Sequence, residues 1–318
     1  MDEFGLINTY FARAAIGSDV LLGIGDDCAI VQPPEGRQLV MSIDTMVDGV
    51  HFPTDTPPER IGWRVMCAAL SDLAAMGATP HWFTLALTLP EPDQEWVAAF
   101  ADGIFAVANR FDLSLIGGDT TRGPLCITVQ VHGSVEPGKA LRRAGARPGD
   151  SIFVTGNLGD GAAALAVIQK KLTVAAGSFS YLLKRFYGPT PRITEGQLLV
   201  GTASAAIDIS DGLYADLSKI CEASGVGAEI SVESLPISEH WRNAASPDRA
   251  QMWALTGGDD YQLCFTVPPS QVKKVGKWIE DGRLVATEIG TITDKYEVVV
   301  MKNGKPMELE RRGYNHFG

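Results

Sequence analysis

The first half of the chain alternates short apolar runs with longer stretches in which apolar residues recur every three or four positions. The longer stretches predict helices over residues 57–77 and 93–111. The first of these begins at Pro57 and Pro58 and ends at Gly77, as helices commonly do. The short runs predict strands over residues 19–25, 37–44, 81–90, 113–118 and 125–135. The pattern therefore indicates a mixed α and β domain.

The pattern is interrupted between residues 136 and 150, where Gly, Pro and Arg are frequent and no hydrophobic period is present. We interpret this stretch as a connection, and we expect two domains, residues 1–136 and 137–318. The second half restarts with a strand at residues 151–156, a glycine turn at 156–161 and an alanine-rich helix at 162–171. A further helix is predicted at residues 213–224, and further strands are predicted at 204–210, 228–232, 253–258, 261–267 and 288–293.

Aspartate follows an apolar run, often with an intervening Gly or Ser, at six places in the sequence. The residues are Asp26, Asp27, Asp44, Asp72, Asp119, Asp208, Asp211, Asp259 and Asp260. One such aspartate would ordinarily form a turn or cap a helix. Recurrence at six places instead indicates a shared site, because loops at strand ends carry functional residues. Several carboxylates that share one space also need cations to remain ionised.

The residue types favour Mg²⁺ as that cation. Carboxylate oxygens are its usual ligands, whereas the five histidines are scattered and lack the HxxH or HExxH spacing of zinc sites. Asp208 and Asp211 are close enough in sequence to reach one cluster, and Ser210 between them can offer a hydroxyl to a phosphate. Because Mg²⁺ held by carboxylates usually also binds substrate phosphates, nucleotide chemistry is predicted. The P-loop and protein-kinase motifs are both absent from the sequence.

Composition and charge narrow the class further. The chain has 318 residues, of which 45% are hydrophobic and 20% charged, as in an ordinary globular protein. The net charge of -11 argues against a nucleic-acid partner. No apolar stretch approaches the roughly 18 residues of a membrane span, and no signal-peptide core is present near the N-terminus. The five cysteines are odd in number and widely spaced, so we expect free thiols and a cytoplasmic protein.

Eight segments together resemble the thiamine-monophosphate kinase family, part of a superfamily of ATP-dependent enzymes that includes aminoimidazole ribonucleotide synthetase. They are GIGDDCAIV, SIDTMVDGVHF, LSDLAAMGATP, LIGGDTTRGP, RRAGARPGDSIFVTGNLGD, AIDISDGLYADL, TGGDDYQLCFTVP and GYNHF. The resemblance implies a mixed α/β, two-domain PurM-like fold. Its N-terminal domain would bind ATP and Mg²⁺ and form a barrel-like sheet across a homodimer. Its C-terminal α/β domain would complete the nucleotide and substrate site.

The resemblance also implies the reaction, the last step of thiamine diphosphate synthesis. With ATP as co-substrate, the γ-phosphoryl group would pass directly to the phosphate of thiamine monophosphate. No general base is expected, because the attacking oxygen belongs to a phosphate that is largely ionised at pH 7. Several Mg²⁺ ions would serve as electrostatic clamps that cancel the repulsion between the two phosphates.

Individual roles follow from the same resemblance. The implied metal ligands are Asp27, Ser42, Asp44, Asp72, Asp119, Asp208 and Asp211, with Asp44, Asp72 and Asp119 the most critical. The implied nucleotide contacts are Gly118, Asp119, Arg143 and Ser210, and the implied substrate contacts are His51, Asp260, Tyr314 and Phe317. The chain departs from the family at Asp259, where GGED is usual, and at Ile43, where STDT is usual. A ligand at position 43 would have to be the backbone carbonyl.

Other interpretations stay open. Selenophosphate synthetase needs a reactive Cys near the N-terminus, whereas the first cysteine here, Cys28, lies inside the metal motif. The hydrogenase-maturation member ends in a modified cysteine, and the purine-pathway enzyme lacks the matches at residues 49–52 and 313–317. A non-catalytic Mg-nucleotide sensor and a structural cation site are the alternatives outside these enzymes. Thermal stabilisation by nucleotide would argue against the structural site.

Overall fold

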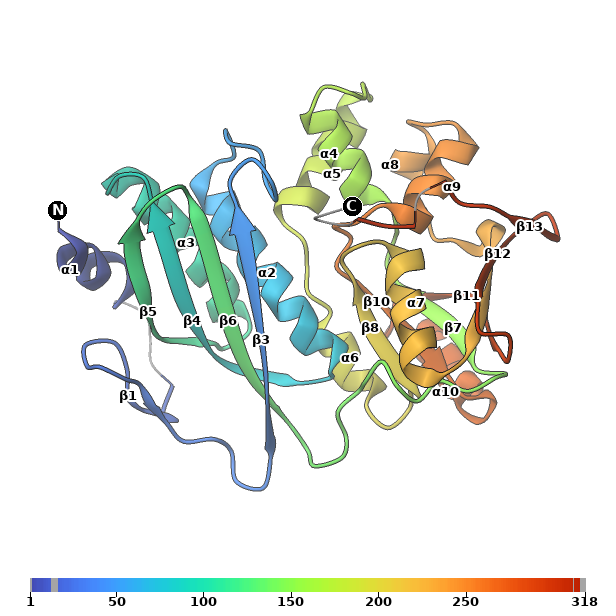
Figure 1. Ribbon diagram of the computed structural model, residues 1–318, viewed down its shortest axis with the longest axis horizontal. Helices are drawn as coiled ribbons and strands as arrows, with labels where there is room; N and C mark the ends of the chain where they lie inside the picture. The colour runs from blue at the N-terminus through green and yellow to red at the C-terminus, as the bar shows by residue number, and fades with distance from the viewer. Residues whose placement is uncertain (1, 13–16, 311, 315–318) are drawn as a thin grey trace. The chain divides into compact units, whose positions relative to one another are not determined.

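The computed structural model describes residues 2–12, 17–310 and 312–314 (Figure 1). It divides into two compact units, residues 1–73 with 78–138, and residues 74–77 with 139–318. Helices and strands are mixed in both, so the predicted fold class is confirmed. The division after residue 138 lies close to the predicted boundary after residue 136. Within the described residues, no helix is both long and apolar enough to cross a membrane.

A four-stranded sheet covered on one face by two long helices forms the first unit. The strand order is β3 (Gln38–Val47), β6 (Cys126–Val135), β4 (Thr79–Leu89) and β5 (Ser114–Arg122). Only β4 and β5 are parallel neighbours. The helices α2 (Pro58–Ala75) and α3 (Gln94–Arg110) lie behind this sheet in Figure 1.

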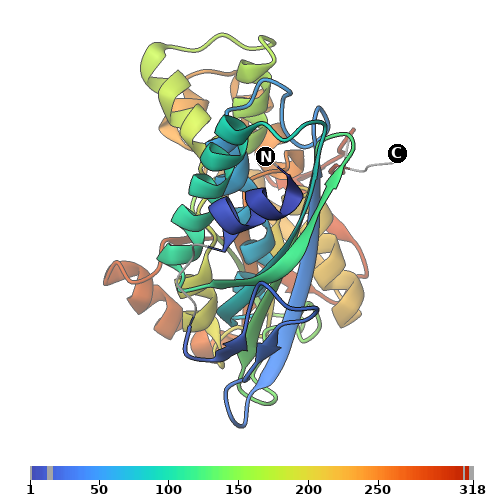
Figure 2. The same cartoon turned by 90° about the vertical axis from the view of Figure 1, so that its left-hand side faces the viewer.

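Small elements lie beside the β5 edge of the sheet, and Figure 2 shows the first of them, α1, in front. They are α1 (Glu3–Leu6), η1 (Ile7–Phe11), β1 (Val20–Leu22) and β2 (Ile30–Val31). The sequence pattern predicted a strand over residues 19–25 but gave no signal for α1 or η1, because helices this short have almost no periodicity.

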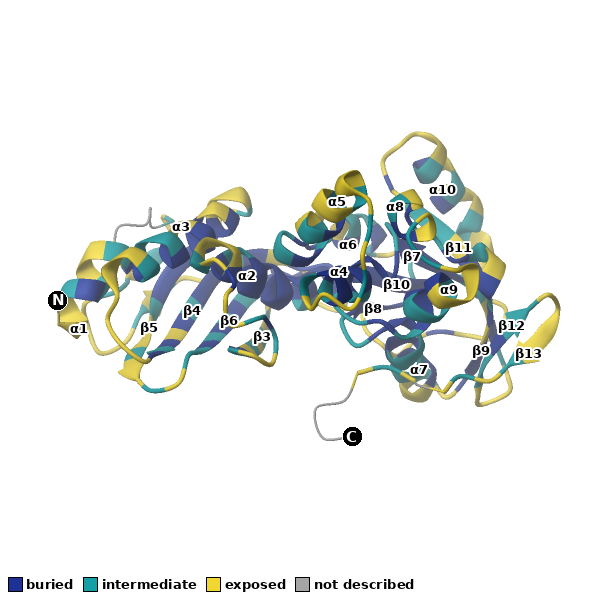
Figure 3. Ribbon diagram, turned by 90° about the horizontal axis from the view of Figure 1, so that it is seen from above, coloured by how far each residue is buried: buried dark blue, intermediate teal, exposed yellow. Residues whose placement is uncertain are grey.

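Alternation along β3 sends its side chains to two different surroundings. Ser42 and Asp44 lie on the face that α2 covers, and Met46 on the same face is buried. Leu39, Met41 and Ile43 point to the opposite face, where they are 41%, 61% and 62% exposed. Figure 3 shows the buried residues concentrated along α2 and the central strands. The edge strand β3 therefore carries an apolar stripe that the described chain leaves uncovered.

Two glycines let α2 and α3 approach closely. A Cβ added to Gly103 would lie 2.0 Å from the carbonyl oxygen of Glu59. A Cβ added to Gly62 would lie 2.3 Å from the carbonyl oxygen of Phe100. Both distances are far shorter than the van der Waals contact distance between carbon and oxygen. The close packing of α2 against α3 therefore requires glycine on both helices, although glycine lowers helix propensity.

The second unit is built on a seven-stranded sheet whose described strands run in the order β13-β12-β9-β11-β7-β10-β8. Its strands are β7 (Ser151–Thr155), β8 (Ala205–Ile209), β9 (Gly227–Ser231), β10 (Gln262–Val267), β11 (Ala286–Thr293), β12 (Val298–Lys302) and β13 (Lys305–Met307). Its helices are α4 (Asp160–Ile168), α5 (Ala176–Tyr187), α6 (Ile193–Leu199), α7 (Leu213–Ser224), η2 (Val232–Ser234), α8 (Glu239–Arg242), α9 (Pro247–Thr256) and α10 (Pro269–Glu280).

The apolar core of the second unit holds the strand β8 and the following helix α7 in a fixed orientation to each other. Ile207 and Ile209 of β8 are buried in one apolar cluster with Leu213 and Leu217 of α7. The strand and the helix are therefore held on both sides of the short turn that joins them, at residues 210–212. A second cluster, which includes Leu182, Phe186 and Trp241, joins α4, α5, α8 and α9.

We expect Gly103→Ala to destabilise the protein by about 1–3 kcal/mol, because the added methyl group forces α2 and α3 apart. Gly276→Ala in α10 is the matched control, since a Cβ there meets nothing within 4 Å. The control should be neutral or stabilising by up to about 1 kcal/mol. Urea unfolding measures both, and equal effects for the two variants would contradict the close helix crossing.

Candidate active site

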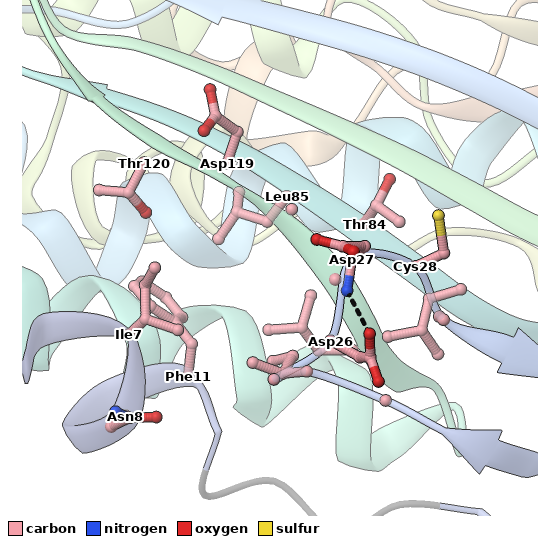
Figure 4. Close-up of a pocket in the computed structure, with 18 of the residues that line it drawn as sticks. Ile7, Asn8, Phe11, Asp26, Asp27, Cys28, Thr84, Leu85, Asp119 and Thr120 are labelled. Atoms are coloured by element: carbon pink, nitrogen blue, oxygen red, sulfur yellow. Dashed lines mark hydrogen bonds between the residues drawn. The ribbon is translucent and has the colours of Figure 1, made fainter. Parts of the chain in front are cut away.

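A cavity of about 860 Å³ lies at the β5 edge of the first unit (Figure 4). Phe4, Ile7, Phe11, Leu115 and Ile116 supply much of its apolar lining. Its polar lining includes Asp26, Asp27, Gly118, Asp119 and Thr120. An apolar wall with a few polar groups is typical of pockets for small organic ligands, and the volume suits a nucleotide.

The loop between β1 and β2 brings Asp26 and Asp27 to this pocket. Gly25 has φ 122°, a conformation that side chains rarely adopt, so the loop turns there. The backbone N–H of Asp27 donates to Oδ1 of Asp26 at 2.8 Å, the dashed line in Figure 4. The side chain of Asp27 is left at the pocket lining, beside exposed Cys28.

Asp119 reaches the pocket from β5. Its neighbour Gly118 pairs with Leu85 of β4, and a Cβ at Gly118 would lie 1.9 Å from the Leu85 carbonyl oxygen. Only glycine fits at this close approach. Gly118 and Asp119 thus line the same cavity as Asp27.

Ser42, Asp44 and Asp72 meet between β3 and α2. The Ser42 hydroxyl donates to Oδ2 of Asp72. Burial, together with the charge of Asp72, raises the pKa of Asp44 to about 6. A carboxylate whose proton affinity is raised by burial and by a neighbouring carboxylate would be stabilised in its charged form by a cation.

His51 follows β3 in a turn of the first unit. Its Nδ1 accepts the backbone N–H of Val47 at 3.0 Å, so Nε2 is the nitrogen that carries the proton in the neutral ring. The buried Arg64 of α2 donates to the His51 carbonyl oxygen at 3.4 Å. The contact with Val47 leaves Nε2 as the ring nitrogen that can donate a hydrogen bond.

In the second unit, the residues AIDISDGL run from β8 into α7. Asp208 is 6% exposed on the edge strand β8, and Ser210 and Asp211 form the turn that follows it. Gly212 has φ 118°, and a Cβ there would lie 2.8 Å from the backbone carbon of Thr256. The turn therefore depends on glycine both for its conformation and for space.

Asp216 in the first turn of α7 holds this turn in place. Its Oδ2 accepts three consecutive backbone N–H groups, those of Ser210 at 3.1 Å, Asp211 at 3.0 Å and Gly212 at 3.1 Å. Lys219 pairs with Oδ1 of Asp216 at 2.8 Å and with Oδ2 of Asp211 at 2.7 Å. Burial raises the pKa of Asp216, and the hydrogen bond from Lys219 opposes that rise.

The loop GGDDYQ lies against the same turn. Asp259 donates its backbone N–H to the Ser210 carbonyl at 2.9 Å, and a Cβ on Gly258 would lie 2.5 Å from that oxygen. Asp259 and Tyr261 both have left-handed φ values, 70° and 49°, and the Tyr261 hydroxyl donates to the Asp259 carboxylate at 3.1 Å. Non-glycine residues rarely adopt this conformation, which is frequent at functional sites.

Asp260 points into the protein. It is 2% exposed, and its two oxygens accept the backbone N–H groups of Gly159 at 2.7 Å and Gly161 at 3.1 Å. Burial raises the pKa of Asp260 to about 8 although the two amides oppose the rise, and neighbouring Asp160 adds to it. In this structure Asp260 caps the start of α4, so a contact with substrate would require it to leave the amides.

The remaining predicted residues lie at the surface of the second unit or outside the described chain. Arg143 is exposed in the stretch that follows β6, and its carbonyl accepts the Ser224 hydroxyl. Tyr314 is 52% exposed, and its backbone N–H donates to the Asp211 carbonyl at 3.0 Å. Phe317 lies outside the described residues.

Two groups of predicted metal ligands lie in the first unit: Ser42, Asp44 and Asp72 form one, and Asp27 and Asp119 share the pocket lining. Both groups offer carboxylate or hydroxyl oxygens, which are the ligands that a hard cation such as Mg²⁺ prefers. Among the described residues, however, no three Asp, Glu, His or Cys side chains are close enough to hold a metal ion as they stand. Of the predicted carboxylates, Asp44 and Asp72 are close enough to interact electrostatically.

Comparison with known proteins identifies the family. The AIR synthase related protein models match residues 25–135 with the N-terminal domain and 147–303 with the C-terminal domain. The thiamine-monophosphate kinase of Salmonella typhimurium is 48% identical over 318 residues, covering 99% of this chain and 98% of that protein. This chain belongs to the thiamine-monophosphate kinase family.

Solved structures agree with the family assignment. A thiamine-monophosphate kinase from Stenotrophomonas maltophilia K279a has a TM-score of 0.88 and 46% identity, over 96% of this chain and 98% of that one. AaThiL, solved in complex with AMPPCP and TMP, has a TM-score of 0.79 and 32% identity, over 99% of this chain and 97% of that one. The predicted membership of the thiamine-monophosphate kinase family is therefore confirmed.

The sequence pattern did not predict two parts of the site. The pocket wall formed by Phe4, Ile7 and Phe11 gave no signal, because its helical turns are too short for a period. Asp216 and Lys219 were overlooked in a helix of ordinary composition. The available signal was an acidic residue in the first turn after Ser-Asp-Gly, where a side chain can bind free backbone N–H groups.

Asp44→Asn should stabilise the protein without divalent cations by about 1–3 kcal/mol at pH 7, because about 1.4 kcal/mol corresponds to each unit of pKa difference. Between pH 4 and 6 the folded parent keeps a proton on Asp44 that the unfolded chain releases. The free-energy cost of ionising Asp44 in the folded parent, and with it the stability advantage of Asp44→Asn, therefore grows as the pH rises through that window. Below pH 4 both states are protonated and the difference should disappear.

Urea unfolding from pH 4 to 7 measures this difference, with exposed Asp55→Asn as the control. Addition of Mg²⁺ should stabilise the parent more than Asp44→Asn, because the cation binds the carboxylate that the variant lacks. A constant difference between parent and variant across the pH range would contradict the burial of a charged Asp44.

Proposed function

We propose that this chain transfers the γ-phosphoryl group of ATP to the phosphate of thiamine monophosphate and forms thiamine diphosphate. The observation that carries the proposal is full-length similarity to proteins named for this activity, at 48% identity in Salmonella typhimurium. The similar AaThiL was solved with AMPPCP and TMP, a pair that fits an ATP analogue and the phosphate acceptor. A nucleotide-sized cavity in the first unit gives this chain a place for the donor.

The pocket at the β5 edge suits the nucleotide. Its apolar wall, with Phe11 and Leu115, can hold an adenine base, and its polar lining carries Gly118 and Asp119 toward the phosphates. Ser210 and Arg143 would supply further contacts, because a hydroxyl and a guanidinium both bind phosphate oxygens. Arg143 is exposed and free to reach a ligand by side-chain rotation.

The carboxylates would hold Mg²⁺. The proposed ligands are Asp27, Ser42, Asp44, Asp72, Asp119, Asp208 and Asp211. When bound, the cations would neutralise the phosphate charges and so lower the barrier to in-line transfer. The chain itself contributes orientation: Ser42 holds the Asp72 carboxylate, and Asp216 holds the Ser210–Gly212 turn. No base is needed to deprotonate a phosphate that is already ionised.

At the substrate end, His51 can donate from Nε2 to an acceptor on thiamine monophosphate, because its Nδ1 is occupied by the Val47 N–H. Tyr314 is exposed and can stack on a ring, and Phe317 is proposed beside it. Asp260 would act here by fixing the GGDDYQ loop and the start of α4. Asp259, on the same loop, would then be the carboxylate nearer to the substrate.

A product assay tests the activity directly. The protein with ATP, Mg²⁺ and thiamine monophosphate should yield thiamine diphosphate by chromatography, and free thiamine should give none. Asp72→Asn should reduce turnover by a factor on the order of 100 or more, because an electrostatic group is lost from the transfer site. Asp55→Asn should leave turnover unchanged. Absence of product from a folded, ATP-binding protein would reject the proposal in favour of another reaction of the superfamily.

We also propose that the chain is a homodimer and resides in the cytoplasm. The uncovered face of the edge strand β3 carries Leu39, Met41 and Ile43, and such a stripe commonly marks an interface. A second copy could extend the sheet across this face into the barrel-like form implied by the family. The five cysteines are free thiols, which supports a reducing compartment.

The double variant Met41→Asp/Ile43→Asp should convert a dimer of about twice 34.0 kDa into a monomer. Dimer formation would bury the two unpaired carboxylates of each copy against the apolar residues of the other, which is energetically costly. Light scattering after size exclusion measures the mass. Phe179→Asp, at another exposed apolar position on α5, is the control and should remain dimeric. A monomeric parent would contradict the proposal.

A further inference from the structure

The turn that carries Ser210 and Asp211 is held by two residues that themselves have no place in the proposed metal or nucleotide set. Asp216 is 1% exposed, and one of its oxygens accepts the N–H groups of all three turn residues. Lys219, one helical turn further along α7, bridges Asp216 and Asp211. No other side chain of the described residues donates to either carboxylate.

We propose that Asp216 and Lys219 are positioning residues that hold Ser210 and Asp211 in the conformation needed to bind Mg²⁺-nucleotide. This inference rests on the proposed function, which makes Ser210 a nucleotide contact and Asp211 a metal ligand. Neither positioning residue needs to touch the nucleotide or the cation.

The backbone part of the proposal depends on Asp216. The backbone N–H groups of Ser210, Asp211 and Gly212 precede the first hydrogen-bonded turn of α7. Without Asp216 they would therefore have no hydrogen-bond acceptor within the helix. A buried carboxylate oxygen that accepts all three leaves the turn one favourable conformation. The Ser210 carbonyl is engaged as well, by the Asp259 N–H at 2.9 Å. Both backbone groups of Ser210 are thus fixed, which restricts the positions that its hydroxyl can reach.

The side-chain part depends on Lys219. Its Nζ lies 2.7 Å from Oδ2 of Asp211, whereas Oδ1 of Asp211 has no hydrogen-bond partner among the described residues. Oδ1 is therefore the oxygen that remains for a cation. Because Lys219 is also tied to Oδ1 of Asp216 at 2.8 Å, its position is set by the same residue that holds the turn.

An opposite role for Lys219 is physically reasonable and must be separated from this one. An ammonium group beside Asp211 also repels a cation, so Lys219 could compete with Mg²⁺ for that carboxylate. Positioning predicts that Mg²⁺ binds less well once Lys219 is removed. Competition predicts that Mg²⁺ binds better.

Calorimetric binding of AMPPCP, with Mg²⁺ or with EDTA, tests the proposal without depending on turnover. The variants are Asp216→Asn, Lys219→Met and Lys219→Arg, and the melting temperature of each is measured without ligand. Glu222→Gln, exposed on the same helix, and Lys277→Met, exposed on α10, are the matched controls. The parent is also assayed for thiamine diphosphate formation, so that failure of the proposed function is seen separately.

We expect Asp216→Asn to weaken binding of Mg²⁺-AMPPCP tenfold or more, and to weaken AMPPCP binding in EDTA by a clearly smaller factor, because only the Ser210 contact operates without the cation. Lys219→Met should raise the Mg²⁺ concentration for half-maximal binding at least threefold, and Lys219→Arg should restore most of the loss. The two controls should match the parent.

Variants that melt at lower temperature but keep the parent's affinity would overturn the inference, since a purely structural role predicts that result. A lower Mg²⁺ requirement in Lys219→Met would overturn the part assigned to Lys219. If Asp216→Asn does not fold, the two Lys219 variants decide, because that side chain is partly exposed. A parent that binds no Mg²⁺-AMPPCP would overturn the proposed function and the inference with it.

Discussion

The structure depends on keeping carboxylates together inside a protein whose net charge is already -11. Like charges in a half-buried place raise each other's proton affinity, and the chain shows this at Asp44, whose pKa rises to about 6 because of burial and then Asp72. Folding alone does not remove that penalty. A cation that bound there would stabilise the fold, so that ligand binding and stability would be coupled through the same residues.

Glycine is the second requirement, because it lets the backbone beside two of the aspartates pack closely against a neighbouring segment. Gly118 lies against the Leu85 carbonyl beside Asp119, and Gly258 lies against the Ser210 carbonyl beside Asp259. In both cases the aspartate directly follows a glycine that no larger residue can replace. The recurring Gly-Asp pattern thus has a steric cause in addition to any role of the aspartate in chemistry.

The sequence allowed the long elements to be predicted because their apolar pattern is strong. The helix predicted over residues 57–77 is α2 (Pro58–Ala75), and the strand predicted over 37–44 is the start of β3 (Gln38–Val47). The apolar run at 253–258 is different: Trp253 and Leu255 end the helix α9, which Ser246 caps and Pro247 begins. A short apolar run fits a strand or a helix equally well, and here packing against Trp241 decides.

The candidate site was predictable only in part, for a related reason. Motifs indicate which aspartates are unusual, but the surroundings decide what each one does. Asp260 and Asp216 lie in motifs like the others, yet each binds backbone N–H groups and is almost fully buried.

Asp27 and Asp119 receive no side-chain hydrogen bond from the described residues and line a cavity. The number of donors that the chain itself supplies to a carboxylate therefore distinguishes Asp216 and Asp260, which stabilise the backbone, from Asp27 and Asp119, which keep the free oxygens that the proposed ligand role needs. By that criterion Asp211 is intermediate, since Lys219 binds one oxygen and leaves the other. One oxygen of Asp211 thus orders the turn and the other stays available, which is the arrangement expected of a turn that is ordered before its ligand binds.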